Sequence, residues 1–226
     1  MKKSFLFLVA LSCALFLFTG CPDPNSNPEA PAENPNGTVT VHDIVIDIPT
    51  VSLEELPASV GEDSFAGKTY ENVNVNVNGF VDRYVFNDDG TVSTHYDYIY
   101  DYSYDSNFLY MRIKYLDLED PGTGDVIKER VTPQEYINYI AVYLAQNFDK
   151  IVGSKKALLP LYNENKASCD EASGGDSYED YIVYTFNIYL GIDELGCLLK
   201  YTYNENSFTE IIDGSEQNVT YTLVED

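Results

Sequence analysis

The sequence predicts a mainly β protein, an antiparallel meander of about eight strands closed into a barrel, with one inserted helix. Three observations support this prediction. Short segments of alternating apolar and polar residues recur from residue 68 onward. Turn-forming residues separate these segments at short intervals, as in antiparallel sheets. A single segment after residue 132 has helical periodicity. An open antiparallel sheet packed on the helix is the alternative architecture.

The strands are expected in chain order with short links between them. Residues 39–41 and 44–48 form two short strands, which end at Pro49 because proline cannot donate to the sheet. The sequence Asn87-Asp88-Asp89-Gly90 is typical of a hairpin turn. The next strand is expected from residue 68 and includes the valine–asparagine alternation at 72–78. Further strands are expected at 80–86, from 91, and at 96–104, 108–115, 126–131, 181–190, 197–203, 207–212 and 217–224.

One helix is expected between these strands. Thr132 is a suitable N-cap, Pro133 suits the first helical position, and Glu135 completes a capping box. Apolar and aromatic residues then recur at helical spacing as far as Phe148. Residues 153–180 show little periodicity and are expected to form an irregular loop.

The segment from residue 96 to residue 104 contains a ladder of tyrosines. They alternate with other residues, and alternate residues of a strand face the same side. All five should therefore share one face, either inside the barrel, as core or around a small ligand, or outside as an adhesive surface. The ladder consists of Tyr96, Tyr98, Tyr100, Tyr102 and Tyr104.

The N-terminal residues predict export. Lys2 and Lys3 precede an apolar run at 4–18, which is too short for a bilayer span of about 20 residues. Phe18-Thr19-Gly20-Cys21 resembles a bacterial lipobox of the relaxed, spirochaete type. The resemblance implies cleavage of a signal peptide at 1–20 and acylation of Cys21, with palmitate-type chains that hold the protein on a membrane.

A tether and one domain should follow the signal peptide. Residues 22–37 are rich in proline and contain no large apolar side chain, so with Cys21 they form a lipidated spacer at 21–37. Residues 38–226 are then expected to form a single β domain.

The composition excludes some functions. The chain carries 13 basic and 37 acidic residues, a formal charge of −24, which argues against nucleic-acid binding. His42 and His95 have no metal-ligand spacing, and no nucleophile motif is found, so no enzyme activity, metal or cofactor is expected. Export permits a disulfide between Cys169 and Cys197, although two separate thiols are the alternative.

A family resemblance rests on two segments. Phe65-Ala66-Gly67-Lys68-Thr69-Tyr70 precedes a strand, and residues 84–92 form an aromatic hairpin that turns on Asp89-Gly90. Together they resemble bacterial lipocalin-like lipoproteins. The resemblance implies a lipocalin-like barrel, with Tyr70 at the position where such proteins commonly have tryptophan.

These observations favour an acyl-anchored lipoprotein of the bacterial cell envelope with a binding or structural β domain. Its partners would be the membrane, through the acyl chains on Cys21, and a small apolar ligand. The alternative function is a surface adhesin that binds another protein through aromatic and acidic faces. The leaflet, periplasmic or surface-exposed, stays open.

Overall fold

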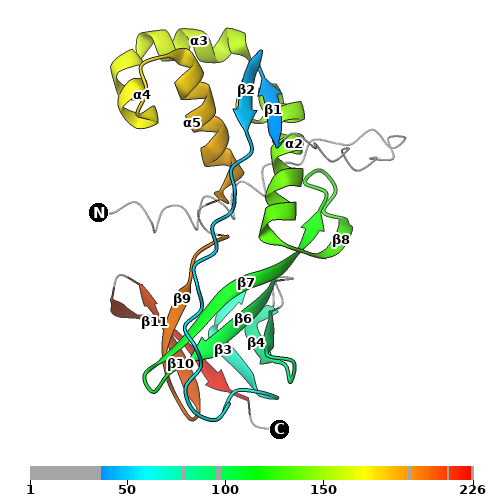
Figure 1. The fold of residues 1–226 in the computed structure, drawn as a ribbon, viewed down its shortest axis with the longest axis vertical. Helices are drawn as coiled ribbons and strands as arrows, with labels where there is room; N and C mark the ends of the chain where they lie inside the picture. Colours follow the sequence, from blue (N-terminus) through cyan, green and yellow to red (C-terminus); the bar gives the residue numbers. More distant parts are fainter. Residues whose placement is uncertain (1–36, 78–79, 95–97, 193–194, 213, 225–226) are drawn as a thin grey trace. The chain divides into compact units, whose positions relative to one another are not determined.

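The computed structural model describes residues 37–77, 80–94, 98–192, 195–212 and 214–224, and for 73–77, 80–81 and 216–218 the backbone alone. The described residues fall into two compact units. We call residues 37–50, 118–128 and 134–192 the helical unit, and the rest the barrel unit. Figure 1 shows the helices and strands of both units; β7 (Phe108–Glu119), β8 (Val126–Val131) and α2 (Pro133–Ile151) each cross a boundary between them.

The barrel unit is a closed antiparallel barrel of eight strands, as the sequence predicts. Consecutive strands of the ring pair with one another, β7 pairs with β9 because β8 lies outside the ring, and the pairing of β11 with β3 closes the ring. The architecture is that of a lipocalin-like barrel, and its strands are drawn as arrows in Figure 1. In ring order they are β3 (Thr69–Val77), β4 (Phe80–Phe86), β5 (Thr91–Thr94), β6 (Tyr98–Tyr104), β7 (Phe108–Glu119), β9 (Leu199–Asn204), β10 (Ser207–Ile212) and β11 (Ser215–Leu223).

Turn chemistry fixes the register of the strands. The β4–β5 hairpin turns at Gly90, whose φ of +78° suits glycine. Asp89 Oδ1 accepts hydrogen bonds from the backbone N–H and the hydroxyl of Thr91.

A ninth strand of the same sheet, β8 (Val126–Val131), pairs with β7 and lies outside the ring.

The helical unit contains four helices where the sequence predicted one. The expected helix is α2 (Pro133–Ile151), which runs one turn further than predicted. The expected loop and the expected strand at 181–190 are instead α3 (Lys155–Glu164), α4 (Lys166–Ser173) and α5 (Tyr178–Leu190). Ile182, Phe186 and Leu190 are buried at helical spacing on α5, so this aromatic segment packs as a helix and the strand prediction was wrong.

A short hairpin packs on α2 within the helical unit. It consists of β1 (Thr38–Val41) and β2 (Ile44–Asp47). Its turn residue His42 approaches Asp149 Oδ1 through Nε2 at 2.5 Å and meets the Phe148 ring edge-on at 5.4 Å. His42 thus holds the hairpin on the helix.

Candidate functional site

The barrel interior is lined mainly by aromatic side chains. Twelve buried residues from the barrel strands and the segment before β3 form its core. Tyr100 and Tyr104 belong to this core, and Tyr98 and Tyr102 pack against it, so the described members of the tyrosine ladder point inward. Tyr96 lies outside the described residues. The other core residues are Phe65, Tyr70, Tyr84, Phe86, Val92, Leu109, Met111, Tyr201, Phe208 and Tyr221.

A buried carboxylate is positioned among these rings. Asp82 on β4 is 8% exposed, and Tyr221 of β11 donates its hydroxyl to Asp82 Oδ2 at 2.6 Å. Asp82 has the same strand parity as Tyr84 and Phe86, so it faces the interior with them. Its cross-strand partner on β3 is Asn72, which is 2% exposed.

A second acidic side chain lies near Asp82. Burial raises the pKa of Glu210 on β10, and the negative charge of Asp82 raises it further. Burial also raises the pKa of Tyr84 to about 12, with Asp82 as the next cause. The phenol of Tyr84 is hydrogen-bonded to the phenols of Tyr201 and Tyr221. We call Asp82, Glu210 and these three tyrosines the acid–tyrosine cluster.

The acid–tyrosine cluster places two acidic groups next to aromatic rings. Carboxylates and the electron-rich faces of aromatic rings both attract an organic cation. The described part of the chain contains no group of three or more histidine, cysteine or acidic residues that could hold a metal ion. His95, the histidine expected on a barrel strand, lies outside the described residues.

The opposite end of the interior is filled by Phe65. This residue precedes β3, and its side chain is 1% exposed. Its ring centroid lies 5.0 Å from that of Tyr203 and 5.1 Å from that of Phe86. The turn that leads from Phe65 into β3 is fixed by backbone hydrogen bonds from Gly67 to Phe86 and from Lys68 to Phe65.

Sequence reasoning singled out the tyrosine ladder but missed the buried Asp82 and Phe65 and the half-buried Glu210. The available signal for the two acids was their place in the strand alternation. Asp82 is two residues from Tyr84, and Glu210 is two residues from Phe208, so each acid lies on the same strand face as a buried aromatic residue. A charged residue is usually expected to face solvent, even where its neighbours on the same strand face are aromatic. Only closure of the barrel turns that strand face towards the interior.

The other predicted site residues fall elsewhere. Cys21 and the whole tether up to residue 36 lie outside the described residues. Cys169 is buried on α4 and Cys197 is exposed, and both are thiols that no disulfide joins. The expected pairing assumed that Cys169 lay in an irregular loop. Instead its side chain packs within the helical unit, where it forms a hydrogen bond with Tyr181.

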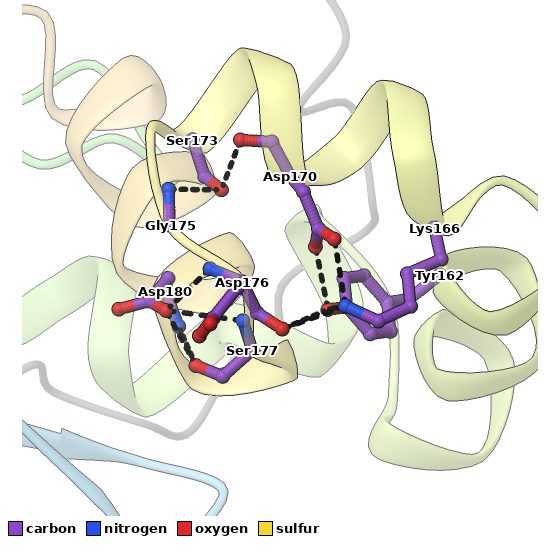
Figure 2. A network of polar contacts seen from close by, with 8 residues as sticks. All are labelled: Tyr162, Lys166, Asp170, Ser173, Gly175, Asp176, Ser177 and Asp180. Carbon is purple, nitrogen blue, oxygen red and sulfur yellow. Dashed lines mark hydrogen bonds and ion pairs between the residues drawn. The ribbon is translucent and has the colours of Figure 1, made fainter.

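A polar network holds the ends of α3, α4 and α5 together (Figure 2). Lys166 Nζ donates to Asp170 Oδ2 at 2.6 Å, to the carbonyl of Asp176 at 2.6 Å and to the hydroxyl of Tyr162 at 3.0 Å. Ser177 and Asp180 form a capping box at the start of α5. These contacts satisfy backbone and charged groups at helix ends, so the network is structural.

None of the described helices is long and apolar enough to cross a membrane.

The chain has no match among protein-family models, curated proteins or solved structures.

Proposed function

We propose that this protein is an acyl-anchored lipoprotein of the bacterial cell envelope whose barrel is a non-enzymatic binding module. The lipobox-like sequence at residues 18–21 and the proline-rich tether support the anchor. The acid–tyrosine cluster supports the binding role and is the observation that carries it.

The chemistry of the acid–tyrosine cluster defines the class of ligand. Aromatic rings around Asp82 and Glu210 offer contact area for an apolar or aromatic body. The two acids favour a cationic head, which would also compensate the cost of burying carboxylates. The ligand is therefore a small organic ammonium compound rather than a purely apolar molecule.

The inward orientation of the tyrosines favours this proposal over a surface adhesin. An adhesive face would need the ladder to point outward, whereas Tyr100 and Tyr104 are each 7% exposed.

Two ions of similar shape and opposite charge test the ligand class by calorimetry on the purified mature protein. We expect 2-phenylethylammonium to bind and phenylacetate to bind at least about tenfold more weakly. Asp82→Asn, which keeps an acceptor for Tyr221, should weaken ammonium binding about tenfold or more. Asp88→Asn, at an exposed turn of the same barrel, is the matched control and should leave binding unchanged. Equal binding of both ions would refute the cation site.

Metabolic labelling tests the anchor separately. An alkyne fatty acid should label the wild-type protein and spare Cys21→Ser. Equal labelling of the two proteins would show that Cys21 is not the acylated residue.

A further inference from the structure

Phe65 is packed among aromatic rings of the barrel interior. Its ring lies against five other aromatic rings at centroid distances of 5.0 to 6.3 Å, which are typical of aromatic pairs. These rings come from four barrel strands, whereas Phe65 comes from the chain that precedes the barrel. They belong to Tyr70, Phe86, Tyr102, Tyr104 and Tyr203.

The segment that carries Phe65 is held less firmly than the barrel. Residues 51–64, which we call the strap, contain no helix or strand, and most of their side chains are exposed. The backbone N–H of Glu54 donates to Gly196 at 3.0 Å, and that of Val60 donates to Tyr104 at 2.8 Å. Arg112 Nη1 donates to the carbonyl of Glu54 at 2.6 Å. A segment with so few buried contacts belongs to the part of a protein that opens locally.

One exposed side chain fastens the strap next to Phe65. Asp63 Oδ1 accepts hydrogen bonds from the backbone N–H of Phe65 at 2.8 Å and of Ala66 at 3.2 Å. Asp63 Oδ2 accepts from the Tyr102 hydroxyl at 2.5 Å. Tyr102 is also one of the rings around Phe65, so this hydrogen bond connects the strap directly to the wall of the pocket.

We propose that the Phe65 end of the barrel is a second, gated binding site for a small uncharged aromatic ring, with Phe65 as its resident occupant. When the strap opens, Phe65 leaves and exposes a ring-sized pocket lined by Phe86 and four tyrosines. An external ring then competes with Phe65 for that pocket. The site is distinct from the acid–tyrosine cluster and does not depend on its cation specificity.

The gate has a thermodynamic signature. A ligand that binds only the open state has its apparent affinity reduced by the fraction of molecules that are open. Replacing Phe65 by alanine removes the competing ring and this penalty. The gain in affinity should therefore match the opening equilibrium of the strap.

Phenol and hydrogen exchange test the proposal on the full mature protein. We expect Phe65→Ala to bind phenol at least about tenfold more tightly than wild type does. Cyclohexanol, which has the same size without an aromatic ring, should bind more weakly. In wild type, phenol should accelerate exchange of the Val60 and Gly67 amides because it stabilises the open state. Unchanged or slowed exchange at these amides under saturating phenol would overturn the proposal.

A second variant keeps the test decisive if Phe65→Ala does not fold. Tyr102→Phe preserves the ring next to Phe65 and removes only the hydrogen bond to Asp63. It should speed exchange of Val60 and Gly67 and tighten phenol binding by the same factor. Glu62→Gln, on the exposed strap beside Asp63, is the control and should change neither quantity. Faster exchange in Tyr102→Phe without tighter phenol binding would also reject the gate.

Discussion

The hydroxyl of Tyr221 lies 2.6 Å from Oδ2 of Asp82 and joins the last barrel strand to the second across β3. The bond is buried, so the hydroxyl donor compensates part of the cost of removing a carboxylate from water. It also crosses the seam where the barrel closes, at which β3 and β11 pair at Glu71–Thr222 and Tyr70–Leu223. We infer that this contact supports closure of the ring.

Removing this hydroxyl should destabilise the protein. Tyr221→Phe leaves the aromatic ring in place and takes one donor from a buried carboxylate. We expect the free energy of unfolding to fall by about 1–3 kcal/mol, the cost of a buried polar group that loses its partner. Urea denaturation monitors this loss. Tyr115→Phe, on β7 of the same barrel, is the control, and an equal effect of both variants would contradict the assigned role of Tyr221.

The pH dependence of stability should report Glu210. Because the folded state raises the pKa of Glu210, mainly by burial, it favours the protonated acid. The contribution of Glu210 to stability is then complete below its ordinary value of 4.5 and is lost as the pH rises through the raised folded value. Glu210→Gln should remove this loss of stability. The free energy of unfolding of Glu210→Gln, measured by urea denaturation, should therefore increase relative to that of wild type from pH 4 towards pH 7. Glu205→Gln, at the exposed β9–β10 turn, should show no such growth.

The interior tyrosines should resist ionisation. Burial and the charge of Asp82 raise the pKa of Tyr84 to about 12. The neutral phenol is favoured in the folded state, so stability due to Tyr84 is lost as the pH rises from about 10 through about 12. Spectrophotometric titration should show a class of tyrosines that ionises only at this higher pH or on unfolding. Tyr84→Phe should reduce the size of that class, and full ionisation of all tyrosines near pH 10 in the folded protein would contradict the assignment.

The helical unit should depend on Lys166. Its ammonium group connects α4 to α3 through Tyr162 and to the start of α5 through the carbonyl of Asp176. Lys166→Met keeps much of the side-chain length and removes the three donors. We expect a lower midpoint of thermal unfolding, followed by far-ultraviolet circular dichroism at helical wavelengths. Lys156→Met, at an exposed position of α3, should leave the midpoint unchanged.

Local sequence patterns identified many of the barrel strands and their turns. Period-two alternation identified β6 and placed the tyrosines from 98 to 104 on one face, and Asn87 to Gly90 identified the β4–β5 turn. The capping residues around Pro133 located the start of α2. These features are local, because strand parity and turn conformation depend on residues close together in the chain.

Local patterns failed where aromatic and β-branched residues form a helix. The segment at 178–190 has the composition of a strand, but tertiary packing buries Ile182, Phe186 and Leu190 along one face of α5. The capping box of Ser177 and Asp180 was the available signal for this helix. The intrinsic β propensity of this segment was overridden because burying one face of the helix stabilises the fold more than the β preference of individual residues does.

By itself, the sequence determined the antiparallel barrel class, the alternation of the tyrosines and the chemistry expected at the N-terminus. It did not determine the full strand order, because β8 lies outside the ring and the segment expected as a strand at 181–190 lies in α5. Only the tertiary structure decided that the tyrosines face inward, that Phe65 fills one end and that Asp82 and Glu210 share an interior. The physical reason is distance along the chain. Residues 82, 210 and 221 come together only when the first and last strands pair, and no local pattern encodes that closure.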